Sequence, residues 1–137
     1  MKTVNRGGWV FYYSTVVLSN LDDNKVGKWI VFFNDINWAK ATCTQAITNN
    51  IIHTCKHSDN DNGIICFYLN FDDIASHKKL INWLINKNMI QKTKDGKYYN
   101  ISFKLDEQTL SNQYGKDFKP SIKLSDFIDL KTGIFIR

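Results

Sequence analysis

Apolar residues in this chain fall into short runs separated by polar turns, which is the pattern of a β-rich protein. The first run, residues 9–18, is rich in aromatic and β-branched side chains and predicts a strand. Further strands are predicted at 29–33, 51–58, 64–70, 98–105 and 133–136. The run at 64–70 is almost continuously apolar, so we expect it near the centre of a sheet.

Two other segments carry apolar residues at helical spacing. In the first, at 35–49, Ile36, Cys43 and Ile47 share one side, and Asn34 or Asp35 can cap the first turn. The second, at 72–90, opens with two aspartates, which favour the positive end of a helix dipole. Its predicted buried stripe consists of Ile74, Ile81, Leu84, Ile85 and Met89.

The order of these elements from 29 to 105 is β-α-β-β-α-β, the succession of a ferredoxin-like split sheet in the α+β class. This succession predicts both helices on one face of the sheet. We expect the N-terminal strand at 9–18 and a C-terminal strand at 133–136 to extend the sheet, with a helical turn at 125–130 between the last two strands.

The chain has 137 residues, 43% of them hydrophobic, which is enough for one domain with its own core. Its net charge of +5 favours an anionic partner, such as a nucleotide, an RNA, a phosphopeptide or an acidic protein, and it also serves solubility. No apolar run is long enough to span a bilayer, so we expect no membrane partner. Abundant Asn, Ile and Lys fit a cytoplasmic protein of an AT-rich bacterial host or its phage.

Cys43, Cys55 and Cys66 are spaced by 12 and 11 residues and form no CxxC pair. We predict buried, reduced thiols and therefore a reducing compartment. The three histidines are too scattered for a metal site, and no glycine-rich phosphate loop occurs, so the sequence predicts neither a metal nor a cofactor.

Lysines stand at or near the ends of three predicted strands, each close to an aromatic or hydroxyl group. Because phosphate needs positive charge together with hydrogen-bond donors, lysines that converge in this way would make an anion pocket. Asp106 either orients Lys104 through an ion pair or caps the turn that follows. The candidate ligand-binding residues are Lys28, Trp29, Lys56, Ser58, Lys104, Asp106, Thr109 and Tyr114.

Several of these positions belong to short motifs: GKW at 27–29, KHS at 56–58, CFYLN at 66–70 and FKLDEQT at 103–109, followed after four residues by Tyr114. In this order the motifs resemble the Bles03/UPF0696 family and related bacterial and phage proteins with a phosphothreonine lyase domain. The resemblance covers about 27–114 and implies an eIF4E-like α+β fold.

For phosphothreonine lyase chemistry, the resemblance assigns Lys56 as the base, Lys28 as a phosphate-binding lysine and Lys104 as the match to a phosphate-binding arginine. The acid histidine of those enzymes would fall at Ile30, which cannot donate a proton. His57 is adjacent to Lys56, but neighbours in a strand point to opposite faces. We therefore expect binding rather than catalysis.

Cap-binding proteins of this fold stack a base between two aromatic rings, and the candidate rings here are Trp9, Tyr12, Trp29, Trp38 and Tyr114. Each also suits a core role, Trp29 and Trp38 more than Trp9. The triplet at 77–79, His-Lys-Lys, is interpreted as a solvated helix face.

Three hypotheses follow from the sequence. The leading one is a module that binds, and in a phage sequesters, a phosphorylated small molecule such as a nucleotide or a nucleotide-derived signal. The alternatives are a phosphothreonine lyase-like enzyme and a domain that inhibits a protein partner through its surface.

Overall fold

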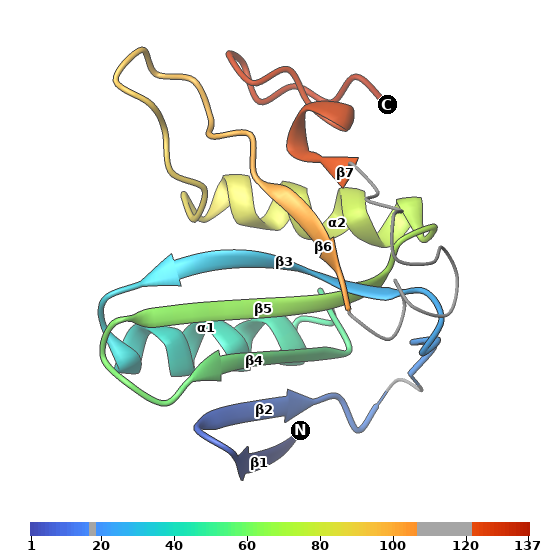
Figure 1. Ribbon diagram of the computed structural model, residues 1–137, viewed down its shortest axis with the longest axis vertical. Coiled ribbons are helices and arrows are strands. Elements are labelled where there is room, and N and C mark those ends of the chain that lie inside the picture. Colours follow the sequence, from blue (N-terminus) through green and yellow to red (C-terminus); the bar gives the residue numbers. More distant parts are fainter. Residues whose placement is uncertain (17–18, 107–121) are drawn as a thin grey trace.

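The computed structural model describes residues 1–16, 19–106 and 122–137. Its seven strands form an antiparallel sheet in the order β1-β2-β4-β5-β3-β6-β7, with two helices (Figure 1). The elements are β1 (Lys2–Arg6), β2 (Trp9–Tyr13), β3 (Val26–Phe33), α1 (Ile36–Thr48), β4 (Thr54–Ser58), β5 (Gly63–Asn70), α2 (Ile74–Asn86), β6 (Ser102–Leu105), β7 (Ile122–Lys123) and a short 3₁₀ helix (Leu124–Asp126).

The succession from β3 to β6 is the predicted β-α-β-β-α-β order. Strand β5 lies between β4 and β3, so the most apolar run is central, as its composition predicted. Strand β6 lies on the other side of β3. The strands that matter for the site therefore come from segments far apart in the sequence.

The N-terminal strand is a hairpin rather than the single strand predicted at 9–18. Strand β1 pairs with β2 from Lys2–Tyr13 to Arg6–Trp9. Gly7 and Gly8, between the strands, both have positive φ angles, +59° and +82°. A two-residue turn of this kind needs positive φ at both central positions, which glycine adopts without strain.

The C-terminal strand predicted at 133–136 is wrong. This segment folds back on the residues just before it: the N–H of Asp129 donates to the carbonyl of Ile134, and the N–H of Ile136 donates to that of Phe127. The Asp129 carboxylate accepts from the N–H groups of Lys131 and Thr132 and closes the turn. Because these backbone groups are satisfied locally, the segment does not pair with the sheet, and β7 pairs with β6 instead.

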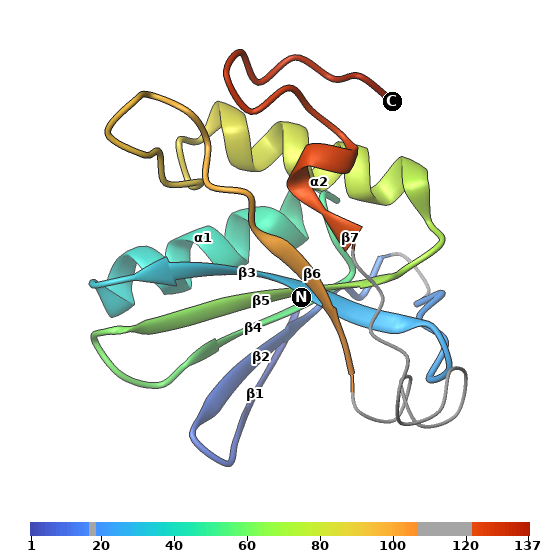
Figure 2. The same cartoon turned by 45° about the horizontal axis from the view of Figure 1, so that its top comes forward.

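Both helices pack on the same face of the sheet, as the sequence predicted (Figures 1 and 2). Asp35 caps α1 by accepting from the N–H groups of Asn37 and Trp38, and Asp73 caps α2 in the same way. The two helices share one buried core with alternate residues of the strands. The core-facing residues of the four central strands include Trp29, Val31, Phe33, Cys55, His57, Ile65, Phe67, Leu69, Phe103 and Leu105.

The opposite face of the sheet carries no helix among the described residues (Figure 1). Its side chains are the other half of each strand, because successive residues of a strand point to opposite faces. Burial alternates accordingly along β2, where Val10 and Tyr12 are buried and the residues on either side of them are half-buried. We call this surface the open face.

The three cysteines are free and buried, in agreement with the prediction. The Sγ of Cys55 lies 3.9 Å from the carbonyl oxygen of Cys43, and burial raises the pKa of the Cys66 thiol. Neither described helix has the length and apolar character needed to cross a membrane.

Candidate anion-binding face and adjoining cavity

Lys28, Lys56 and Lys104 all lie on the open face. Lys28 is the cross-strand partner of Lys104 on one side and of Tyr68 on the other. Lys56 pairs with Cys66, two residues before Tyr68 on the same strand. The antiparallel order β4-β5-β3-β6 therefore brings together three lysines that are up to 76 positions apart. The sequence placed each lysine near a strand end, and the strand order places them on one surface.

Aromatic rings contact two of these lysines, Lys28 and Lys56. The Nζ atoms of Lys28 and Lys56 lie 6.0 and 5.8 Å from the centre of the Tyr68 ring. The Nζ of Lys56 is also 3.9 Å from the centre of the Trp9 ring and 5.3 Å from that of Phe11. Rings attract an ammonium group through their negative faces, so they hold the Lys56 side chain over the sheet.

Burial is the main cause that lowers the pKa of Lys56, and the positive charges of Lys28 and Arg6 lower this pKa further. Cys66 and Asp106 act in the opposite direction. An ammonium group that is partly desolvated beside other cations gains when an anion binds it, because the anion replaces the missing stabilisation of the charge. The electrostatics of the face therefore favour a bound anion.

Asp106 pairs with Lys28 rather than with Lys104. Its Oδ1 lies 3.1 Å from the Nζ of Lys28, and its backbone N–H donates to the carbonyl of Val26. Both side chains are about one-third exposed or less. The carboxylate thus holds the Lys28 ammonium at the edge of the face, and it also competes there with any anionic ligand.

The candidate Trp29 is a core residue, which corrects its assignment as a ligand-binding side chain. Lys28, its neighbour in β3, faces the open side, so Trp29 points to the opposite face and is fully buried in the core. Its indole N–H donates to Nδ1 of His77 over 2.9 Å. His77 is itself fully buried, so the interpretation of 77–79 as a solvated face is wrong at that position.

His57 faces the core, as expected for the neighbour of Lys56. Its Nε2 lies 3.0 Å from the Tyr12 hydroxyl, and its Nδ1 lies 2.9 Å from the carbonyl oxygen of Ser58. The Ser58 hydroxyl accepts from the N–H of Ile64 and donates to the side-chain oxygen of Asn60. This candidate hydroxyl therefore closes the β4–β5 loop.

Among the other stacking candidates, Tyr12 is buried in the core and Trp9 lies on the open face beside Lys56. Trp38 is 39% exposed, so its proposed core role is wrong. Thr109 and Tyr114 lie outside the described residues.

Ile30 lies on the open face in register with Lys56, with Cys66 between them on β5. The position where the resemblance expects an acid histidine is therefore on the same surface as the expected base. It carries a hydrocarbon side chain that can neither donate nor accept a proton.

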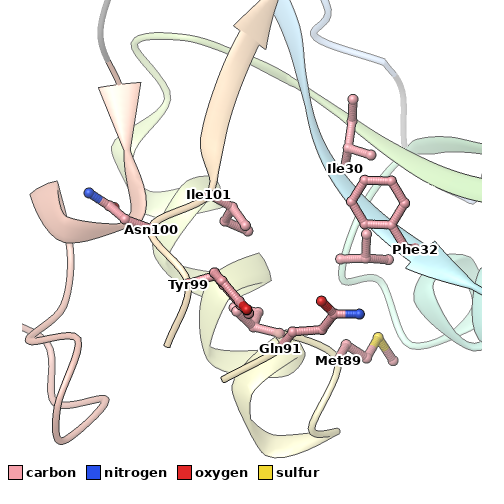
Figure 3. Close-up of a pocket in the computed structure, with 9 residues that line it drawn as sticks. Ile30, Phe32, Met89, Gln91, Tyr99, Asn100 and Ile101 are labelled. Atoms are coloured by element: carbon pink, nitrogen blue, oxygen red, sulfur yellow. The ribbon is translucent and has the colours of Figure 1, made fainter. Parts of the chain in front are cut away.

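A cavity of about 300 Å³ opens at the edge of this face (Figure 3). Strand β6 pairs with β3 at Gly27–Leu105 and Lys28–Lys104. Beyond these pairs the segment 99–101 lies apart from β3, and the cavity fills the gap. Sequence reasoning missed this cavity, because it treated 98–105 as one continuous strand.

The cavity has apolar walls and a few polar groups. Ile30 and Phe32 stand on one side, and Tyr99 and Ile101 on the other (Figure 3). Gln91 extends its amide into the space between them (Figure 3). The backbone N–H of Tyr99 donates to the backbone carbonyl of Gln91. This bond fixes the two segments that carry these polar side chains beside each other.

Apolar walls with a few polar groups are typical of pockets for small organic ligands, and this volume is at the lower end of their range. An amide offers both a donor and an acceptor, as the edge of a nucleobase does. Within the described residues, no group of three or more His, Cys, Asp or Glu side chains could hold a metal ion.

No family model and no curated protein matches this chain. The structure is similar to the crystal structure of Ascaris suum eIF4E-3 in complex with an m2,2,7G cap. The TM-score is 0.52 at 14% sequence identity, over 85% of this chain and 69% of the other. The chain therefore has an eIF4E-like α+β fold, as the resemblance of its motifs implied.

Proposed function

We propose that this protein binds a phosphorylated small molecule, a nucleotide or a nucleotide-derived signal. The phosphate groups contact Lys28, Lys56 and Lys104, and the base enters the cavity beside Ile30. The observation that carries the proposal is the position of Tyr68 between Lys28 and Lys56, with Lys104 directly across from Lys28.

The two parts of the site are within reach of one ligand. Lys28 and Ile30 are consecutive open-face positions of β3, so their Cα atoms are about 6.6 Å apart. The Ascaris suum protein of similar fold was solved with a nucleotide cap, which supports a nucleotide as the ligand class. Sequestration of a signal, as in a phage protein that counters host defence, needs binding without turnover, and Ile30 at the expected acid position fits that role.

The test is calorimetric titration with mono-, di- and cyclic nucleotides. A charge-assisted hydrogen bond contributes about 1.5–3 kcal/mol, so Lys28→Ala, Lys56→Ala and Lys104→Ala should each weaken binding about tenfold or more. Lys40→Ala removes an exposed lysine from α1 on the other face and is the matched control. Wild-type affinity in all three variants would overturn the proposal and favour a surface that binds a protein partner.

A second candidate is the phosphothreonine lyase-like enzyme, favoured by the lowered pKa of Lys56, since a base works best with a pKa near the working pH. General acid catalysis typically contributes about 10²–10⁴-fold, and Ile30 cannot supply it. Mass spectrometry of a phosphothreonine peptide decides between the two functions. A dehydrated product at catalytic turnover, lost in Lys56→Ala, would establish the enzyme.

A further inference from the structure

The basic and aromatic residues of the open face continue well beyond the proposed nucleotide site. In the β1–β2 hairpin, the register places Lys2 opposite Tyr13 and Arg6 opposite Trp9. Lys2 and Arg6 therefore lie on the open face together with Phe11 and Tyr13. Phe11 and Arg6 adjoin Lys56 at the border of the proposed nucleotide site. Lys2 and Tyr13 lie beyond that border and have no role in the site.

The hairpin residues are arranged as ring and cation pairs. The rings of Phe11 and Tyr13 are parallel within 4°, with their centres 6.1 Å apart. The guanidinium carbon of Arg6 lies 4.7 Å from the centre of the Phe11 ring. Phe11 is the cross-strand partner of Lys56. The hairpin is therefore continuous with Lys28, Lys56 and Lys104, which we call the lysine cluster.

The charge of this surface has one predominant sign. Its five cations come from four strands: Lys2 and Arg6 from β1, Lys56 from β4, Lys28 from β3 and Lys104 from β6. Asp106, at the edge, is paired with Lys28. A surface of this kind attracts a polyanion, and its rings offer stacking platforms between the charges.

We propose that the open face from β1 to β6 binds single-stranded nucleic acid, with Tyr13, Phe11, Trp9 and Tyr68 as the rings against which bases stack. The proposal rests on the proposed function for its inner half, where one nucleotide of the strand occupies the Lys28–Lys56–Lys104 cluster. The hairpin binds the nucleotides that follow.

The dimensions of the face suit a strand of several nucleotides. Six strands from β1 to β6 span five inter-strand spacings, or about 24 Å at about 4.8 Å each. At the rise of about 3.4 Å per nucleotide of a stacked strand, that width corresponds to about seven nucleotides. Stacking on rings is tolerant of sequence, so we expect weak base preference along the hairpin.

The test is fluorescence anisotropy with labelled oligouridylates and oligothymidylates of two, four, eight and twelve nucleotides. Affinity should rise with length up to about eight nucleotides and then level off. The double variant Lys2→Gln/Arg6→Gln should weaken octamer binding and lower the slope of log affinity against log salt by about 1.4, at about 0.7 per cation for a single strand. Tyr13→Leu should weaken octamer binding about fivefold or more.

The matched control is Lys40→Gln/Lys87→Gln, which removes two exposed cations from α1 and the end of α2. Stronger binding of the uridylate series than of the thymidylate series would identify RNA as the strand, and the reverse order would identify DNA. Tyr13→Leu should leave mononucleotide binding unchanged.

Equal affinity for dimer and octamer, or a hairpin variant that behaves like the control, would overturn this inference while leaving the proposed nucleotide site intact. Octamer binding that depends on the hairpin, without any mononucleotide binding, would support the inference and contradict the proposed function. No binding of either ligand would overturn both.

Discussion

The Nζ atom of Lys56 lies 3.9 Å from the centre of the Trp9 ring on the neighbouring strand. This contact joins the lysine cluster to the aromatic residues of the β1–β2 hairpin. It also covers the ammonium group, and burial is the main reason that the Lys56 pKa is lowered from 10.5. Because the charge of Lys56 is lost at a lower pH than that of an ordinary lysine, anion binding by the open face should depend on pH.

Nucleotide affinity should fall with rising pH earlier than an ordinary lysine would allow. Lys56 loses its proton below pH 10.5, and the neutral amine no longer attracts a phosphate. Lys56→Arg should keep its affinity to higher pH, because arginine stays protonated. Titrations at several pH values between 7 and 10 measure the nucleotide affinities of wild type and of Lys56→Arg. The affinity of the arginine variant relative to that of wild type should increase as the pH rises. A constant ratio would contradict the prediction.

Filling the cavity should separate the binding of the base from the binding of phosphate. Ile101→Trp places a large ring between Ile30 and Tyr99 and should weaken nucleotide binding about five- to 100-fold, the range of lost stacking. Binding of inorganic pyrophosphate to the lysines should not change. Lys40→Ala, on α1 and outside the cavity lining, is the control.

If Ile101→Trp lowers the melting temperature markedly, Tyr99→Ala provides the same test, since the Tyr99 side chain is 48% exposed. Parallel losses for the nucleotide and for pyrophosphate would show that the base does not enter the cavity.

Asp106→Asn should strengthen anion binding. The carboxylate holds Lys28 at 3.1 Å, and a phosphate must compete with it for the same ammonium group. Partly exposed ion pairs contribute about 0.2–1 kcal/mol, so the gain should reach at most about fivefold. Isothermal titration at constant ionic strength measures this gain. A loss of affinity would instead mean that Asp106 is needed to position Lys28.

His77 should make the fold less stable in mild acid. Burial lowers its pKa, and Nδ1 accepts the Trp29 indole N–H, so the folded state holds the neutral ring. The unfolded chain takes up a proton first, near the ordinary value of 6.5. The free energy of unfolding should therefore fall as the pH decreases below 6.5, and level off once the pH lies below the lowered pKa.

Urea unfolding of wild type and of His77→Gln at several pH values between 5 and 8 tests this dependence. The variant should lose about 1–3 kcal/mol at neutral pH, because it disturbs the buried partner of the Trp29 N–H, and should lose most of the slope below pH 6.5. The same slope in both proteins would exclude His77 as its source.

The sequence by itself determined the types and the order of the elements from β3 to β6. The apolar run at 64–70, the helix caps and the alternation at Lys56 and His57 are local properties of the chain, so they predicted β5, both helices and the opposite orientations of these two side chains. The free, buried cysteines also followed from local spacing and surroundings.

Only the tertiary structure decided which residues meet. Strand register places Lys104 beside Lys28 and lets Asp106 form its ion pair with Lys28. No local signal in the sequence encodes a pairing across 76 residues. The same applies to the cavity, which exists because β6 leaves β3 after two pairs, and to the segment 133–136, whose turn on Asp129 competes with the sheet for its hydrogen bonds. Successive residues of a strand point to opposite faces, so the helices decide which of them are buried. Trp29 points to the face that the helices cover, and Trp9 points to the open face. Which face the helices cover is decided only when the whole chain packs.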